Sequence, residues 1–184
     1  MAKRKTLDLI VLLMISVFVI TVSAQVYYSL GAKSTITTAT TDVYFVKGVD
    51  NVTAGVSLSP QNTYATLTDL IAYPNASFTY TDPLRVRNNN MTNTYTIRLN
   101  PVSLSGNDTE FIYVNFLLRN GTSETSPTLA SLNYTCDGSS WTNTNATGWI
   151  QIPANTEYAI TVVTKAKDDA ASAQVEIEIA VDVE

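Results

Sequence analysis

The clearest pattern in the chain is an alternation of apolar and mostly acidic side chains at its C-terminal end. Apolar residues occupy every second position from 175 to 183, and Glu176, Glu178 and Asp182 lie between them. Neighbouring side chains on a strand point to opposite faces, so the pattern predicts a strand with one buried face and one wet, negative face. The apolar positions are Val175, Ile177, Ile179, Val181 and Val183.

Further strands are predicted from shorter alternations along the chain. Residues 42–47, 84–87 and 94–99 alternate in this way, and residues 149–165 predict two strands separated by a turn at Pro153. Residues 110–119 carry apolar side chains on both faces, which is typical of a central strand that is covered on both sides.

Only residues 63–72 predict a helix. Leu67, Leu70 and Ile71 follow the i, i+3, i+4 spacing of a helix face, and Pro74 is placed to end the segment. One short helix among about eight strands predicts an all-β fold with two packed sheets.

The N-terminus carries the features of a secretory signal peptide. The basic residues Lys3, Arg4 and Lys5 precede an apolar run from 9 to 22, and a small-x-small pattern ends at Ala24. The run is about fourteen residues, shorter than the ~20 that span a bilayer, which favours cleavage after Ala24. Two alternatives stay open: residues 7–24 remain as a membrane anchor, or the segment is a type IV pilin leader cut before the apolar run.

An extended arm is predicted between the signal peptide and the first core strand. Val26, Tyr28 and Leu30 alternate with more polar positions, and β-branched residues follow Gly31. Such an arm packs in its own domain or inserts into a groove of the next subunit, where main-chain hydrogen bonds supply affinity. The predicted organisation is a signal peptide (1–24), an arm (25–41) and a β-sandwich domain (42–184).

The composition favours a non-catalytic protein. The chain has no His and one Cys, which removes the commonest zinc ligands and any His-dependent catalytic triad. Its formal net charge of -5 argues against binding to nucleic acid. Thr, Ser and Asn supply 27, 15 and 15 residues, and Thr is enriched in strands. We therefore expect no enzymatic activity and no cofactor.

Seven sites have the Asn-x-Ser/Thr pattern of N-glycosylation, about twice the number that chance gives. The composition alone produces some of them, but the export signal would take the chain to a compartment where glycosylation occurs. Most of the seven fall in predicted turns. The candidate sites are Asn51, Asn75, Asn90, Asn107, Asn120, Asn133 and Asn145.

Other candidate chemistry is weaker. Cys136 has no partner within the chain, and a buried thiol is favoured over pairing between chains. Asp50 and the pair Asp168–Asp169 lack the ligand spacing of calcium loops, so solvated turns are favoured. Trp141 and Trp149 leave open a sugar-binding platform, although packing is the commoner role of such residues.

Several segments together resemble a known group of proteins. Residues 26–31, 42–46, 82–89 and 158–162 are similar in layout to archaeal extracellular filament subunits. These subunits form bundling pili and threads, and they are related to the TasA/camelysin-like biofilm fibre proteins.

The resemblance implies a jelly-roll-like two-sheet β-sandwich, export by the general secretory route and surface glycans. It further implies polymerisation by donor-strand complementation, in which the arm of one subunit completes the sandwich of its neighbour. The donor segment would be residues 25 to about 35, with Val26, Tyr28 and Leu30 facing the groove. Some bacterial relatives carry a peptidase label, which no nucleophile–base pair or metal-ligand cluster supports here.

The sequence therefore predicts a structural subunit of an extracellular filament. Its partner would be a second copy in a head-to-tail homopolymer, with neighbouring filaments as a further partner through bundling. The membrane would be contacted only through the signal peptide. Two rival interpretations remain: a membrane-anchored or S-layer-associated surface module, and a monomeric glycan-binding domain.

Overall fold

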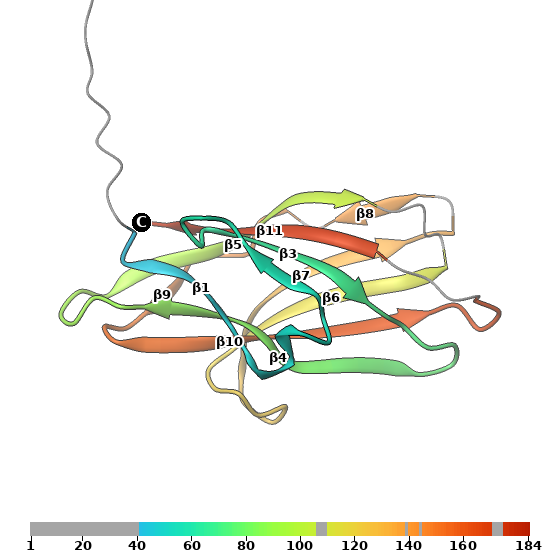
Figure 1. The fold of residues 1–184 in the computed structure, drawn as a ribbon, viewed down its shortest axis with the longest axis horizontal. Helices are drawn as coiled ribbons and strands as arrows, with labels where there is room; N and C mark the ends of the chain where they lie inside the picture. Colours follow the sequence, from blue (N-terminus) through green and yellow to red (C-terminus); the bar gives the residue numbers. More distant parts are fainter. Residues whose placement is uncertain (1–40, 106–109, 139, 144, 171–174) are drawn as a thin grey trace, which may run out of the picture. The chain divides into compact units, whose positions relative to one another are not determined.

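The computed structural model describes residues 41–105, 110–138, 140–143, 145–170 and 175–184. These residues form two antiparallel sheets that pack face to face as a β-sandwich (Figure 1). The predicted all-β, two-sheet sandwich is therefore confirmed.

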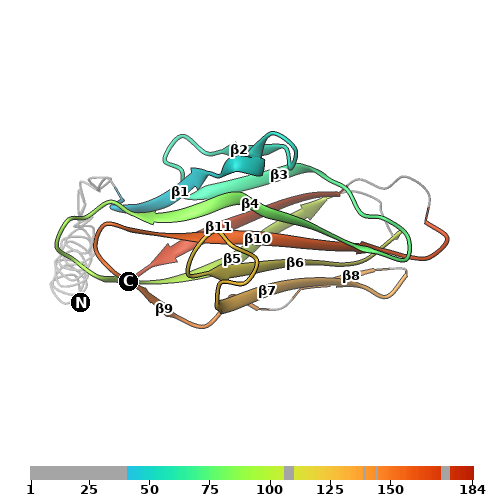
Figure 2. The same ribbon diagram turned by 90° about the horizontal axis from the view of Figure 1, so that it is seen from below.

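The first layer is a six-stranded sheet, which Figure 2 shows with its strands following one another from β1 at the top to β7 and β8 at the bottom. In spatial order it contains β1 (Val43–Lys47), β4 (Ser77–Asn88), β10 (Thr156–Ala166), β6 (Phe111–Arg119), β7 (Thr128–Cys136) and β8 (Trp141–Asn143).

The second layer is a five-stranded sheet. In spatial order it contains β2 (Val56–Leu58), β3 (Tyr64–Leu70), β11 (Val175–Val183), β5 (Tyr95–Ser105) and β9 (Ile150–Ile152). A short 3-10 helix, η1 (Val49–Asn51), follows β1.

The core lies between the two sheets and is built by the alternation of side chains along each strand. In β11, Val175, Ile177 and Ile179 are buried while Glu176 is exposed, as the C-terminal pattern predicts. The largest fully buried side chains include Tyr80, Tyr134, Phe45, Phe111 and Phe116.

The predicted helix over residues 63–72 is wrong, because this segment contains strand β3. Leu67 and Leu70 both point into the core, although they are three residues apart. A register shift in the pairing with β11 lies between them, and the extra residue of such a bulge changes which face a strand presents. The bulge therefore reproduces the i, i+3 spacing of a helix, and Ile71 is 38% exposed.

Strand β6 is central, as predicted, and lies between β10 and β7. Only one of its faces is fully buried; Tyr113 and Leu117 on the other face are half-buried. Residues 120–127 of the β6–β7 loop lie over this outer face, and Thr81 on β4 donates to Oε1 of Glu124 (3.1 Å). The prediction that both faces of β6 are covered is therefore confirmed only in part.

Candidate functional site

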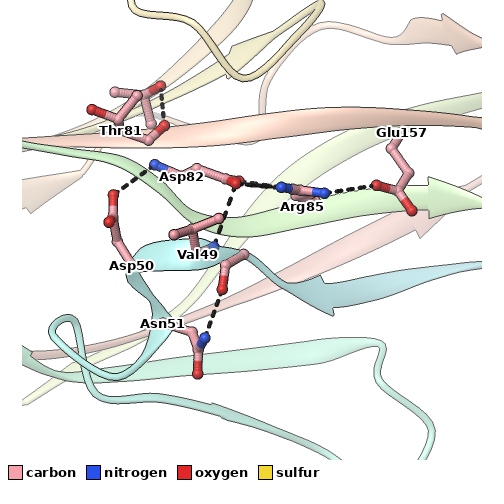
Figure 3. A network of polar contacts seen from close by, with 9 residues as sticks. Val49, Asp50, Asn51, Thr81, Asp82, Arg85 and Glu157 are labelled. Carbon is pink, nitrogen blue, oxygen red and sulfur yellow. Dashed lines mark hydrogen bonds and ion pairs between the residues drawn. The ribbon is translucent and has the colours of Figure 1, made fainter.

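The outer face of the six-stranded sheet carries a polar network near β1, shown in Figure 3. Asp82 on β4 is 4% exposed. Its two carboxylate oxygens accept hydrogen bonds from Nε of Arg85 at 2.9 and 3.1 Å. Arg85 donates through Nη1 to Glu157 Oε2 at 3.1 Å (Figure 3). Arg87 donates through Nη1 to Glu157 Oε1, also at 3.1 Å. The network alternates two carboxylates with two guanidinium groups, so its charges balance.

A bulge in β4 makes this network possible. Leu84 and Tyr80 pair with Ile160 and Val162 of β10, so β4 has two extra residues at this point. The distortion contains Pro83, and proline inside a strand is confined to edges and bulges. Pro83 is therefore the sequence signal that could have located the network, which sequence analysis missed.

The network also holds the segment that follows β1. The backbone N–H of Val49 donates to Asp82 Oδ2 (3.4 Å), and the N–H of Asp82 donates to Asp50 Oδ2 (3.0 Å). Gly48 lies so close that a Cβ there would meet the Asp82 carbonyl oxygen at 2.1 Å. Only glycine therefore fits at this position.

The electrostatics of the network indicate a structural role. Hydrogen bonds to Asp82 and then to Glu157 raise the pKa of Arg85, so its guanidinium stays charged. Asp50, weighed above as a calcium ligand, instead accepts the Asp82 amide. In the part of the chain that the structure describes, no cluster of three or more Asp, Glu, Cys or His could hold a metal ion. Asp168 and Asp169 are exposed in a turn after β10.

A second polar contact, the Asp42 clamp (Asp42, Asn90 and Tyr95), holds the residue at which the chain enters β1. Asp42 Oδ2 accepts hydrogen bonds from the Tyr95 hydroxyl (2.6 Å) and Asn90 Nδ2 (2.8 Å). These bonds lower the pKa of Asp42, and the same hydrogen bond to Asp42 raises the pKa of Tyr95. The clamp fixes the start of the sandwich domain to the β4–β5 loop.

The candidate glycosylation sites differ in accessibility. Asn75, Asn120 and Asn145 are exposed, whereas Asn133 is half-buried within β7 rather than in a turn. Asn107 lies outside the described residues. The exposed sites are therefore the ones that an oligosaccharide can reach without any change in the fold.

Asn51 and Asn90 use their side-chain amides inside the fold. Asn51 Nδ2 donates to the carbonyl of Gly48 (2.6 Å), and Asn90 Nδ2 donates to Asp42. The Asn90 oxygen also accepts from the backbone of Thr92 and Asn93. Since N-glycosylation takes place on this amide nitrogen, a glycan at either site would compete with these hydrogen bonds.

The two tryptophans do not share one exposed platform. Trp141 packs inward against Phe111, with ring centroids 6.0 Å apart. Trp149 is 45% exposed, and the Arg98 guanidinium lies 4.6 Å from its ring centroid. Arg98 also pairs with Asp182 on β11 (2.9 Å). The Trp149 face that Arg98 covers is not available for stacking on a sugar.

The lone cysteine behaves as predicted for a buried thiol. Cys136 at the end of β7 is 9% exposed and carries no disulfide. A covalent link between chains through Cys136 would therefore require this buried thiol to become exposed.

At the edge opposite β1, strand β7 of the six-stranded sheet is covered along only part of its length by the short strand β8. β8 pairs with β7 through Tyr134, Thr135 and Cys136 alone. The stretch Thr128–Leu132, called the open edge below, has no strand partner among the described residues on the side away from β6. It contains no charged residue and no Pro, which are two of the devices that usually protect an edge, although it contains a bulge at Leu129.

Two other edges, those of β5 and β1, are better protected. β5 is covered by β9 at residues 95–97 and by Thr147, whose N–H donates to the Leu99 carbonyl (2.9 Å). Beyond this point β5 contains Pro101 and a bulge at Val102. On β1, the N–H of Phe45 donates to the carbonyl of Asn62 (2.7 Å).

Comparison with known proteins adds no identification, since no protein-family model and no curated protein matches the chain. The predicted cleavage site after Ala24 and the donor-strand residues Val26, Tyr28 and Leu30 lie outside the described residues. Within the described ranges, no helix is long and apolar enough to cross a membrane.

Proposed function

We propose that the chain is a structural subunit of an extracellular filament, exported by its signal peptide and polymerised through its N-terminal arm. In this proposal residues 25–35 of one subunit pair as a strand with the sandwich of the next. Two features support it: the sequence of residues 25–35 alternates as a strand would, and Thr128–Leu132 has no strand partner among the described residues on the side away from β6.

The arm has the composition that strand addition requires. Val26, Tyr28 and Leu30 share one face, so they can enter a groove while the backbone supplies the hydrogen bonds. Because the donor arm and the acceptor edge are different surfaces, each subunit donates to one neighbour and accepts from another. Such a head-to-tail contact builds an open filament unless its rotation closes a ring.

The accessible sequons support a location outside the cell. Asn75, Asn120 and Asn145 are exposed at three separate places: the β3–β4 loop, the β6–β7 loop and the segment between β8 and β9. Glycans there would cover much of a filament surface without entering the core. The acidic outer face of β11 adds charge that keeps such a surface hydrated.

The proposal is tested with the mature chain from residue 25 to 184, examined by negative-stain electron microscopy and sedimentation. Replacing Val26, Tyr28 and Leu30 together by Asn is expected to abolish filaments, because the groove-facing side chains become polar. Replacing Gln25, Tyr27 and Ser29 by Asn is the matched control on the other face of the arm, and it should still polymerise. Filaments of normal length from the first variant, or from a chain lacking residues 25–35, would contradict the proposal.

A further inference from the structure

Resting on the proposed function, we propose that the acceptor for the arm is the open edge of β7, and that its occupant is residues 25–35 of a second copy of this chain. The added strand would extend the six-stranded sheet beside Thr128–Leu132, where β8 does not reach. This inference names the surface that receives the arm, so it can fail while the filament proposal stands.

The hydrogen-bonding direction along β7 identifies the groups that an added strand would use. In the β7–β8 hairpin the N–H of Asp137 donates to the Ser140 carbonyl (3.2 Å), and Thr135 pairs with Thr142. Backbone groups of an antiparallel strand alternate between its two neighbours, so positions 137, 135 and 131 face the side of β8. Ser131 therefore directs its N–H and C=O to the open edge, whereas Leu132 directs its own to β6.

The side chains along the open edge suit an apolar strand. Leu129 is 37% exposed, and Ala130 beside it is half-buried. Leu129 is also the extra residue of a bulge, since Ala130 pairs with Leu118 and Thr128 with Arg119. An added strand with Val26, Tyr28 and Leu30 on one face would cover these apolar groups, and neither strand segment places like charges opposite each other.

Two competing edges are less suitable for the same arm. β5 has Pro101 beside its uncovered end, and Thr147 bonds to its middle through Leu99. β1 uses the N–H of Phe45 for Asn62 and ends in the exposed Lys47. Charge and Pro on an edge strand act against further pairing, whereas bulges occur both in β5 and at Leu129 and do not distinguish the two edges.

The linker between the donor segment and the sandwich is long enough to reach the open edge of either copy. Seven Cα–Cα steps join residue 35 to residue 42, and they span at most about 25 Å. A strand beyond β7 would lie five strand spacings from β1 in the order of the sheet, about 24 Å along the sheet at ~4.8 Å per spacing. A second copy as the occupant is therefore favoured by the proposed head-to-tail assembly, and the mixing experiment below distinguishes it from an arm that folds back on its own β7.

The test uses a proline that removes one edge-facing N–H. Ser131→Pro in the mature chain should leave β6 pairing intact, because proline is tolerated where the N–H faces away from the sheet. We expect it to raise the critical concentration for polymerisation about tenfold or more, through the lost hydrogen bond and the clash of the ring with the incoming strand. Ser131→Ala keeps the N–H and should behave as wild type.

A second edge provides the matched proline control. Gln151 on β9 lies opposite Thr96, whose backbone N–H and C=O bond to Glu184 directly after β11, so the Gln151 N–H faces away from the sheet. Gln151→Pro should therefore polymerise normally. Circular dichroism and thermal unfolding of both proline variants establish that each is folded.

A mixture of two defective variants tests the acceptor assignment separately from the filament proposal. Ser131→Pro retains a working arm, and the Val26/Tyr28/Leu30→Asn variant retains a working edge. Together they should form a one-to-one heterodimer in analytical ultracentrifugation, at concentrations at which neither variant polymerises alone.

Normal filaments from Ser131→Pro, or no heterodimer in the mixture, would overturn the assignment of the open edge. A symmetric dimer of wild-type chains through two β7 edges would overturn it as well. The filament proposal itself is judged separately, by the arm variants alone.

Discussion

The two sides of the six-stranded sheet are built differently. The β1 side carries two separate polar groups. One is the network of Asp82, Arg85, Arg87 and Glu157, joined by ion pairs, and the other is the Asp42 clamp. The β7 side, from Thr128 to Cys136 and Trp141 to Asn143, has no charged residue, and part of its backbone edge has no strand partner among the described residues. The charged side chains of the β1 side are paired within the fold. On the β7 side, the backbone groups of the open edge that face away from β6 have no strand partner among the described residues.

This difference places the proposed donor and acceptor surfaces on opposite sides of the six-stranded sheet. The chain enters the sheet on the β1 side, so force on the arm would be carried by the Asp42 clamp and the Asp82 network. Strand addition on the opposite side would need neither. A subunit with the root of its donor arm on one side and its acceptor edge on the other would assemble head to tail, so every subunit of the filament would have the same orientation.

The largest expected loss of stability on the β1 side comes from Gly48→Ala. The new Cβ would lie 2.1 Å from the Asp82 carbonyl oxygen, so β4 and η1 must separate. We expect a loss of about 2–3 kcal/mol in the free energy of unfolding, as for other overpacked sites. Urea unfolding followed by circular dichroism measures it.

The control for this substitution is Gly148→Ala, because no atom lies within 4 Å of the position that its Cβ would take. Its free energy of unfolding should stay within about 0.5 kcal/mol of wild type. Equal stability of the two variants would mean that η1 is not held against β4.

A smaller effect, dependent on pH, is expected from Asp42→Asn. Tyr95 and Asn90 hold the pKa of Asp42 below its ordinary value of 3.8. The clamp therefore stabilises the fold above that pH, and this contribution is lost as the pH falls through the lower folded-state pKa. Wild type should unfold at a higher temperature than Asp42→Asn near pH 7, and the two should converge once the pH falls below the folded-state pKa of Asp42. A difference that does not change with pH would argue against an ionic clamp.

The smallest effect on stability is expected at the exposed sequons. Asn75→Gln, Asn120→Gln and Asn145→Gln should each remove a glycan from protein made in its native host and change the unfolding temperature by no more than a few degrees. Asn90→Gln should instead destabilise the fold, because it displaces the amide that bonds Asp42. Glycopeptide mass spectrometry and thermal unfolding check both statements. Glycan found on Asn90 and on none of the exposed sites would contradict this ranking.

Sequence patterns predicted the fold well where the alternation is regular. Residues 175–183, with apolar and acidic positions in strict order, form β11, and the break at Pro153 separates β9 from β10. The pattern failed where bulges change the face of a strand. The bulge in β3 produced a false helix, and β7 was not predicted, although Leu132, Tyr134 and Cys136 are buried at alternate positions along it.

The contacts of the site were less predictable than its strands. The Asp82–Arg85–Glu157 network joins β4 to β10 across 72 residues of sequence, and it depends on a bulge that only Pro83 signals. The open edge depends on how far β8 extends, which is a matter of tertiary pairing. Local patterns carry no information on either, since register is set by the partner strands.

The central claim is that this chain is exported, cleaved and polymerised. Negative-stain electron microscopy of the protein sheared from the native cell surface, combined with mass spectrometry of its N-terminus, tests it most directly. The account predicts filaments whose subunits begin at Gln25. Single particles that still carry residues 7–24 would contradict it and would support a membrane-anchored surface module instead.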